Sequence, residues 1–210
     1  MTHVERMKPG KVVDTAGQLT SKHVAAVKAA GHLGVVRYVP HVGAAGRGDI
    51  TACEAATICQ GTGLGLLLVQ HVRLPNWQPT NCSGHDDGMA AASRALGIGY
   101  PLGAHLFVDL EGIAGPGVAT SVYTEAWAQA VVDAGYLAGA YVGYGVPLNA
   151  DQFYALKHVT SYWCDAGPRH VAVRGFAMKQ HPEVTIGGML FDPNDVFADG
   201  KGETPAWMMG

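Results

Sequence analysis

Short apolar runs alternate along the chain with alanine-rich stretches of helical character, and this pattern predicts strands and helices in turn. Eight apolar runs have the length of buried strands and are bounded by glycines, prolines or polar residues. The predicted strands are residues 11–14, 33–39, 64–71, 105–111, 138–143, 161–165, 175–180 and 188–192. The predicted helices are residues 20–30, 50–60, 86–96, 118–134 and 151–158.

Strands that alternate with helices pair in parallel, because each helix provides the crossover between neighbouring strands. Eight strands favour a single α/β domain, a (β/α)8 TIM-like barrel. Its late helices are expected to be irregular or missing, because only a short link with a proline precedes the strand 175–180. A doubly wound open sheet is the alternative. The chain of 210 residues is short for two cores, so we assign residues 1–198 to the barrel domain and residues 199–210 to a C-terminal extension.

Composition and charge are those of a compact globular protein. Hydrophobic residues make up 48% of the chain and charged residues 15%, and the formal net charge is −3. Because no basic patch or stripe is visible, nucleic acid is not an expected partner. No window of 18 apolar residues occurs, so membrane insertion is not expected. Residues 1–10 are polar and lack the apolar core of a signal peptide, from which we expect synthesis in the cytoplasm.

Two carboxylates end the predicted fourth strand. The apolar run that begins at His105 ends in Asp109 and Glu111, and Gly112 follows. Side chains alternate between the faces of a strand, so the two acids point to one side, with Cβ atoms roughly 7 Å apart. Acids that leave an apolar strand are unfavourable unless they are paired or used. Paired carboxylates with different pKa values are typical of glycoside hydrolysis, whereas a strand that runs into a polar loop is the plainer interpretation.

Acids end other predicted strands as well. Asp14 closes the first strand, Asp165 the sixth and Asp192 the eighth. In a parallel barrel the carboxyl ends of all strands meet at one face, where active sites lie. The first and eighth strands become neighbours when the barrel closes, so Asp14 and Asp192 should lie side by side, with Asp109 and Glu111 across the mouth. Each acid alone could be a turn or a helix cap, but the set favours a mouth lined with carboxylates.

Three short segments keep a common order within residues 11–197. They are Lys-Val-Val-Asp-Thr-Ala at 11–16, Leu-Phe-Val-Asp-Leu-Glu at 106–111, and a late Met-Lys-Gln-His followed by Gly-Met-Leu-Phe-Asp-Pro-Asn within 178–194. Together they resemble the glycoside hydrolase family 25 lysozymes and the related bacterial glycoside-hydrolase-like barrels (the domain of unknown function 1906 type). Val-Arg-Tyr at 36–38 and the helix entry at 84–88 are similar to the latter group.

The resemblance implies a modified barrel that hydrolyses, with retention, the β-1,4 bond between N-acetylmuramic acid and N-acetylglucosamine in peptidoglycan. Glu111 would be the general acid that protonates the leaving oxygen. Asp109 would orient and stabilise the N-acetyl group of the substrate, or an equivalent nucleophile. Asp14 and Asp192 would hold the sugar and raise the pKa of Glu111. The chain departs from the lysozyme pattern at His181, where an aromatic residue is commoner.

Five further residues are candidates for substrate binding. Tyr141 and Trp163, on the fifth and sixth strands, could stack on sugar rings, although packing in the core fits the pattern equally well. Gln70 ends the third strand. Gln180 and Arg37 lie in the segments that resemble glycoside-hydrolase-like proteins. No cofactor and no metal is expected, because the ten histidines show no metal-binding pair spacing.

Several functions stay open on the sequence alone. The first is a peptidoglycan-directed glycoside hydrolase, such as a phage lysin that leaves the cell through holes made by another protein, or a wall-degrading virion component. The second is a catalytically silent barrel that binds glycan or builds a cell-envelope or phage assembly. Peptidoglycan or another glycan polymer is the expected partner in both. A third is a metallohydrolase with ligands among His71, His105, His181 and Asp192, although His105 is expected at the wrong end of its strand.

Overall fold

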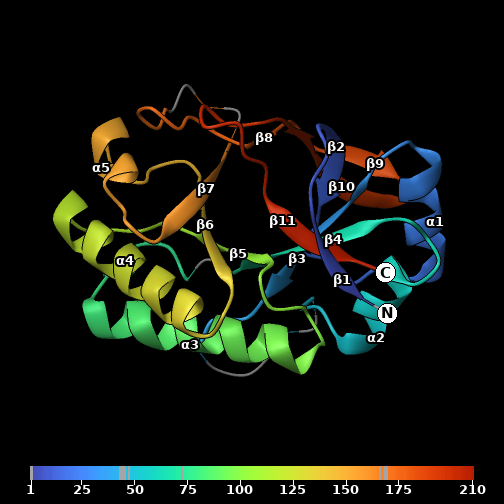
Figure 1. Cartoon of the computed structure of the whole chain (residues 1–210), viewed down its shortest axis with the longest axis horizontal. Coiled ribbons are helices and arrows are strands. Elements are labelled where there is room, and N and C mark those ends of the chain that lie inside the picture. The colour runs from blue at the N-terminus through green and yellow to red at the C-terminus, as the bar shows by residue number, and fades with distance from the viewer. Residues whose placement is uncertain (1, 43–45, 47, 72, 166, 168–169) are drawn as a thin grey trace.

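The computed structural model is an eight-stranded barrel, closed on itself, with helices on its outside (Figure 1). It describes residues 2–42, 46, 48–71, 73–165, 167 and 170–210. The closed ring excludes the open-sheet alternative and confirms the predicted α/β barrel, because β4 pairs with β5 and β10 pairs with β2. In order round the ring, the strands are β2 (Gly10–Asp14), β3 (Gly34–Val39), β4 (Gly65–Gln70), β5 (His105–Asp109), β6 (Leu137–Val142), β7 (Val159–Cys164), β8 (Met178–Gln180) and β10 (Met189–Val196).

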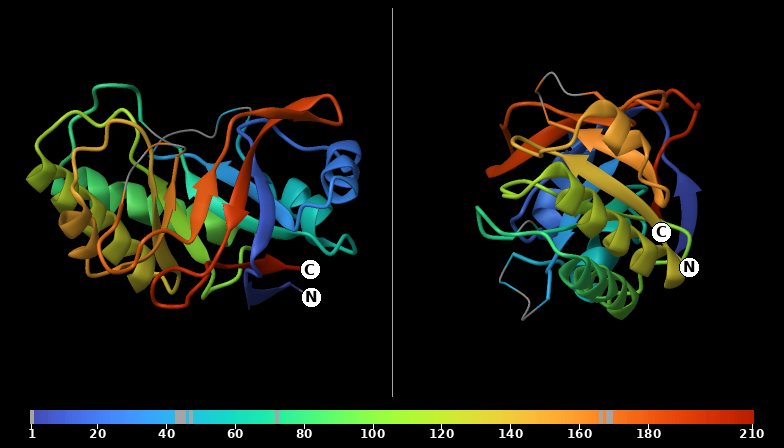
Figure 2. Two further views of the ribbon diagram at one scale, coloured as in Figure 1. Left: turned by 90° about the horizontal axis from the view of Figure 1, so that it is seen from above. Right: turned by 90° about the vertical axis from the view of Figure 1, so that its left-hand side faces the viewer.

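Helices follow the first five barrel strands and pack on the outer face of the barrel (Figure 2). Side-chain caps set several of their starts: Thr80 accepts a hydrogen bond from the Ser83 backbone N–H at 3.0 Å, so the third helix begins five residues before the predicted 86. None of the described helices is long and apolar enough to cross a membrane. The helices are α1 (Ser21–Ala29), α2 (Ala52–Cys59), α3 (Asn81–Gly97), α4 (Gly117–Asp133) and α5 (Ala150–Tyr154).

The helices α3 and α4 lie side by side along one flank of the barrel (Figure 1). Two glycines of α3 allow this approach, because a Cβ atom at Gly84 would meet the backbone of Tyr123 and one at Gly88 would meet the backbone of Trp127. Trp127 is completely buried between the helices and the barrel. The outer core therefore depends on small residues of α3 packed against large ones of α4.

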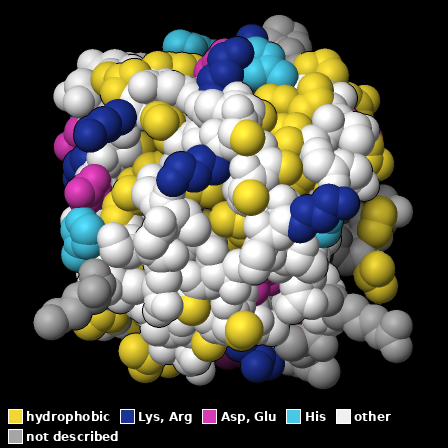
Figure 3. Space-filling view, turned by 90° about the vertical axis from the view of Figure 1, so that its right-hand side faces the viewer, with side chains coloured by type: hydrophobic (Ala, Val, Ile, Leu, Met, Phe, Trp, Pro, Cys, Tyr) yellow, Lys and Arg dark blue, Asp and Glu magenta, His cyan; other side chains and the backbone are white. Residues whose placement is uncertain are grey.

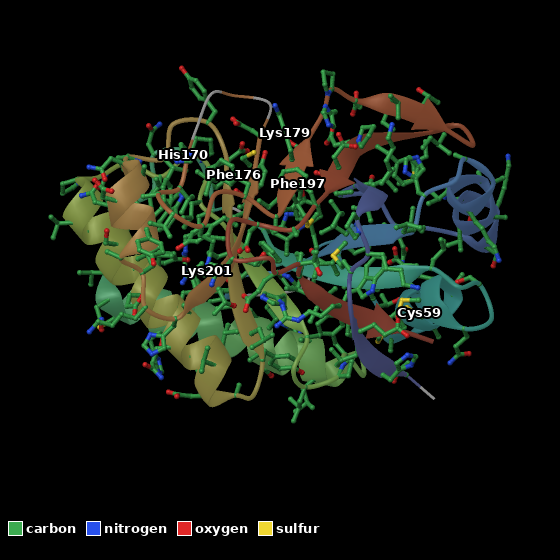
Figure 4. All side chains as sticks on the ribbon, turned by 45° about the horizontal axis from the view of Figure 1, so that its top comes forward. Cys59, His170, Phe176, Lys179, Phe197 and Lys201 are labelled. Atoms are coloured by element: carbon green, nitrogen blue, oxygen red, sulfur yellow. The ribbon has the colours of Figure 1, made fainter. Side chains whose placement is uncertain are left out.

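The last barrel strand corrects the prediction of parallel strands throughout. β10 runs antiparallel to both β2 and β8, because it forms a hairpin with β9 (Val184–Ile186). Gly187 and Gly188 make the turn with φ of 62° and 89°, and a tight turn of this kind reverses the chain, whereas a parallel return needs a long crossover. Where no described helix covers the ring, Lys179 of β8 (Figure 4) is the register partner of Asp195 of β10.

The two ends of the chain meet under the amino end of the barrel (Figure 1). β1 (His3–Arg6) pairs antiparallel with β11 (Ala206–Met209), and Met208 of β11 pairs with Leu66 of β4. Residues 199–210, which the sequence placed outside the barrel domain, thus pack against its base. Trp207 is buried there and belongs to the core inside the barrel, with Met7, Val12, Val36, Leu67, Val69, Phe107, Tyr141, Trp163, Met178 and Val196.

The surface on the side of α1, α2 and the chain termini is mixed in character. Figure 3 shows basic, acidic and apolar side chains interspersed there, without a continuous stripe of one kind on that face. A surface of this sort offers no extended basic footprint for a polyanion. The buried carboxyl groups of Asp14 and Asp109 lie instead at the carboxyl end of the parallel strands.

Candidate active site

Carboxylates from three parts of the chain lie at the carboxyl end of the parallel strands. Asp14 is the last residue of β2 and Asp109 the last residue of β5. Asp192 of β10 is the register partner of Asp14, and Glu111 follows Asp109 at the start of the loop to α4. Asp14, Asp109 and Glu111 all act electrostatically on the hydroxyl of Tyr141. The structure therefore brings the four predicted acids to one mouth.

Asp14 is enclosed by three hydrogen-bond donors. Its Oδ2 accepts from Asn194 Nδ2 at 2.7 Å and from Gln180 Nε2 at 3.1 Å, and its Oδ1 accepts from the Tyr38 hydroxyl at 3.3 Å. The residue is 1% exposed. Burial raises the pKa of Asp14 to about 7, because the loss of hydration outweighs the three donors, and Asp192 adds a smaller repulsion.

Asp109 and Glu111 have different surroundings although they are two residues apart. Asp109 is buried, and its Oδ1 accepts the backbone N–H of Glu111 at 2.9 Å. Burial raises the pKa of Asp109 to about 8, and the nearby carboxylates Glu111 and Asp14 add to the shift. Glu111 is half-buried, and its Oε1 accepts the backbone N–H of Tyr144 at 3.3 Å. One acid is thus closed off and the other is accessible, as a division of roles between two carboxylates requires.

The raised pKa values make stability depend on pH. The folded protein keeps protons on Asp14 and Asp109 that the unfolded chain releases near pH 4, so their contribution is full below about pH 4 and is lost as the pH rises through about 7 and 8. We expect the free energy of unfolding to fall between about pH 5 and 8.5, by an amount on the order of a few kcal/mol. Urea denaturation at several pH values measures this. Asp109→Asn should flatten the profile, and an equally steep profile in that variant would contradict the assignment.

Tyr141 and Gln180, two of the predicted substrate-binding residues, do lie at the mouth. The Tyr141 hydroxyl donates to Gln180 Oε1 at 2.8 Å, and Gln180 in turn donates to Asp14. Burial raises the pKa of Tyr141, and four nearby carboxylates raise it further, those of Glu111, Asp109, Asp14 and Asp165. This hydroxyl therefore stays protonated and acts as a donor. Gln180 is half-buried and can reach a bound molecule.

Trp163 lies beneath these residues as part of the barrel interior. Its ring centroid is 4.4 Å from that of Tyr141, its indole N–H donates to Asn194 Oδ1 at 2.7 Å, and the residue is 1% exposed. A side chain this deeply buried cannot stack on a sugar. We therefore assign Trp163 to the floor of the site, where it orients Asn194 and through it Asp14.

Arg37 and Gln70 are not brought to the mouth. Arg37 points to the outside of the barrel, where its Nε donates to Glu54 Oε1 at 2.7 Å and its Nη1 donates to the carbonyl of Thr15. Gln70 is 1% exposed, and its Oε1 accepts the indole N–H of Trp127 at 2.6 Å. Both side chains use their polar atoms to tie the helix layer to the barrel, so we place them in the framework of the fold instead of the substrate site.

Two residues that the sequence reasoning did not select, Tyr38 and Asn194, lie at the mouth, and so does His71, which the sequence analysis named only as a conceivable metal ligand. Tyr38 and His71 directly follow Arg37 and Gln70 in the chain, and their rings contact each other at a centroid distance of 4.6 Å. Val36 is the register partner of Asp14, and alternate side chains share a face, so Tyr38 points into the barrel as Asp14 does. The sequence does not show this, because strands buried on both faces carry no alternation of polar and apolar residues. Asn194 had a signal, since it closes the Asp-Pro-Asn segment.

The histidines of the described residues are spread over the fold. Among the residues that the structure describes, no three His, Cys, Asp or Glu side chains are arranged to hold a metal ion. His105 is at the amino end of β5, far along the strand from Asp109, and its Nδ1 accepts the backbone N–H of Ala206 at 2.9 Å. Burial lowers its pKa to about 3, so it stays neutral. The position of His105 gives the metallohydrolase interpretation no support.

Comparison with known families agrees with this geometry. The sequence matches, over residues 25–192, the family described as Rv2525c-like, glycoside hydrolase-like domain. The chain belongs to this family. A search of curated proteins finds no match. The resemblance to glycoside-hydrolase-like barrels is thereby confirmed at the level of this family.

Three solved structures share the fold of this glycoside-hydrolase-like chain. The Tat-secreted protein Rv2525c of Mycobacterium tuberculosis, in complex with L-tartrate, has 17% identity and a TM-score of 0.67 over 90% of this chain and 95% of that one. The modular autolysin LytC of Streptococcus pneumoniae, in complex with a synthetic peptidoglycan ligand, has 12% identity and a TM-score of 0.65 over 90% and 47%. A family 25 glycosyl hydrolase of Bacillus anthracis has 11% identity and a TM-score of 0.62 over 89% and 88%.

Proposed function

We propose that this protein is a lysozyme-type glycoside hydrolase that cleaves β-1,4 bonds of peptidoglycan with retention. The observation that carries the proposal is the pair Asp109 and Glu111 at the mouth of the barrel, two carboxyl groups two residues apart of which the first is buried and the second is accessible. Retaining hydrolysis uses two acids in distinct environments, flanking one sugar bond. Asp109 and Glu111 provide two such acids at the end of β5.

In the proposed mechanism Glu111 donates its proton to the oxygen that leaves. The N-acetyl oxygen of the substrate, or an equivalent nucleophile, attacks the anomeric carbon from the other side. Water then completes hydrolysis, with Glu111 acting as base, which retains the configuration. Asp109 acts in this step as a carboxylate, which a pKa of about 8 makes the minor form at neutral pH, so we expect turnover to rise with the ionisation of Asp109. In that form it accepts the acetamide N–H and is stabilised most when positive charge develops beside it.

Asp14 and Asp192 hold the sugar in this proposal and add negative potential. Asp14 is kept in place by hydrogen bonds from Asn194, Gln180 and Tyr38, so a sugar hydroxyl that binds Asp14 would have to displace one of these donors. Asp192 is half-buried and lies beside it in the sheet register. A preorganised set of carboxylates around the anomeric centre supports an oxocarbenium-like transition state.

Two structural neighbours support peptidoglycan as the substrate class: LytC was crystallised with a synthetic peptidoglycan ligand, and the Bacillus anthracis protein is a family 25 glycosyl hydrolase. At 12% and 11% identity these likenesses show a shared fold, and the substrate is our inference. Action at the cell wall, either as a phage lysin or virion component or within a cell-envelope assembly, belongs to the same proposal.

The experiment that tests the function is release of reducing ends from purified peptidoglycan. We expect the wild-type protein to release reducing ends, and borohydride to convert the sugar at the new end to N-acetylmuramitol, the alditol of N-acetylmuramic acid. Folded protein that releases none from several peptidoglycan types would overturn the hydrolase proposal. A heat-unfolded sample provides the blank.

A glycan-binding barrel without turnover is the second candidate. The burial of Asp14 and Asp109, at 1% and 7% exposure, favours it, because a mouth this closed would admit a sugar ring only after local rearrangement. Co-sedimentation with insoluble peptidoglycan separates the candidates: binding together with released reducing ends supports the hydrolase, and binding without release supports the silent module.

A further inference from the structure

The loop that carries Glu111 is bonded to the loop that follows β4. The indole Nε1 of Trp77 donates to the backbone carbonyl of Glu111 at 3.2 Å. The backbone N–H of Asn76 donates to the carbonyl of Gly112 at 2.8 Å, and the N–H of Ala114 donates to the carbonyl of Trp77 at 2.9 Å. Two loops from different crossovers therefore form a short ladder that runs along the backbone of the acid.

The Trp77 loop is itself fixed by an ion pair between the half-buried Arg73 and the buried Asp87. Arg73 donates from Nε and Nη2 to the two carboxylate oxygens of Asp87, at 2.8 and 2.6 Å, and Asp87 on α3 is completely buried. The Tyr123 hydroxyl of α4 donates to the same carboxylate at 2.8 Å, and the Tyr123 ring meets Trp77 edge-on at a centroid distance of 4.7 Å. A bidentate pair of this kind holds geometry strictly. Trp77 is thus supported from the helix layer.

The side chain of Glu111 is held in close contact with the end of β6. A Cβ atom at Gly143 would overlap the carboxyl group of Glu111, so this acid lies directly over the β6 end. Its Oε1 also accepts the Tyr144 N–H at 3.3 Å. A displacement of the Glu111 backbone would therefore move the carboxyl group away from Gly143 and the Tyr144 N–H.

We propose that Trp77 is a positioning residue for Glu111, acting through its indole N–H on the Glu111 carbonyl. The expected effect of Trp77 on kcat rests on the proposed hydrolase function, whereas its effect on the position of the Glu111 carboxyl does not. Because catalysis falls steeply when a reacting group is misplaced, a single lost hydrogen bond to the backbone of the acid is enough to slow the proton transfer.

Trp77→Phe tests the proposal, because it removes the N–H and keeps a ring against Tyr123. We expect kcat for reducing-end release to fall roughly tenfold, with KM within about twofold and the thermal unfolding midpoint near that of the wild type. Leu74→Ala is the matched control: Leu74 lies on the same loop and is 85% exposed. Its kinetics should equal those of the wild type.

A second readout needs no turnover. The amide resonance of Tyr144 in a 15N spectrum reports the Glu111 carboxyl, and Glu111→Gln shows how it moves when that acceptor changes. Trp77→Phe should move the resonance in the same direction, and Leu74→Ala should leave it in place. An unmoved Tyr144 resonance in folded Trp77→Phe overturns the proposal, whatever the kinetics. If this variant does not fold, solvent exchange of the wild-type Trp77 indole N–H decides: protection supports the bond and rapid exchange overturns it.

The two proposals fail separately. If the wild type releases no reducing ends, the hydrolase function fails while the Tyr144 resonance still decides whether Trp77 positions Glu111. If the wild type is active and Trp77→Phe has an unchanged kcat, the hydrolase stands and the role of Trp77 is refuted.

Discussion

Replacing Glu111 by glutamine is expected to lower reducing-end release from peptidoglycan by a factor of roughly 10² to 10⁴, the contribution of a general acid. Glutamine keeps the size of the side chain and can still accept the Tyr144 N–H through its carbonyl oxygen. It has no proton to give to the leaving oxygen. The loss should appear in kcat, because Glu111 contributes to the transition state more than to binding of the sugar.

The control for this variant is Glu5→Gln. Glu5 lies on β1 at the opposite end of the barrel, where it is exposed, so its replacement should leave turnover within about twofold of the wild type. Co-sedimentation with peptidoglycan should be retained by both variants. If Glu111→Gln cleaved as fast as the wild type, the acid would have to be sought elsewhere at the mouth; Asp192, half-buried beside Asp14, would be the next candidate.

The order of the elements and the place of the acids were accessible from the sequence, because both are local. Apolar runs of strand length and alanine-rich helical stretches follow from backbone periodicity, and in a barrel the carboxyl ends of parallel strands converge. Asp14 and Asp109 could therefore be placed together from their positions at strand ends alone. Asp192 also lies beside Asp14, although β10 arrives from the opposite direction and the acid sits near its middle.

What escaped prediction depends on packing between distant segments. Strands buried on both faces carry no alternation of polar and apolar residues. The family resemblance that points to Arg37 and the strand end that points to Gln70 therefore do not reveal that the neighbouring Tyr38 and His71 are the side chains that meet at the mouth. The role of Trp207 was equally hidden. No pattern near residue 207 reveals that the last strand closes the amino end of a barrel whose first strand begins near residue 10.

Trp207→Ala is expected to destabilise the fold by about 3–5 kcal/mol, the usual loss for a large buried aromatic side chain. Trp207 is 4% exposed and belongs to the core inside the barrel, against the first residues of β3 and β4. Removing the ring would leave a cavity at the barrel base, far from Asp109. Urea denaturation measures the change, and Met209→Ala, a half-buried position on the same strand, should have a much smaller effect.

A double-mutant cycle makes the packing argument specific. A Cβ atom at Gly65 would overlap the Trp207 ring, and every one of its nearest neighbours belongs to that ring. Gly65→Ala should therefore lower the free energy of unfolding of the wild type. In the Trp207→Ala background it should lower that free energy by less, or raise it, because the methyl group enters the vacated space. Additive effects of the two changes would mean that the ring does not fill the barrel base. Non-additive effects would establish that Trp207, which lies within the predicted C-terminal extension, is part of the barrel's own core.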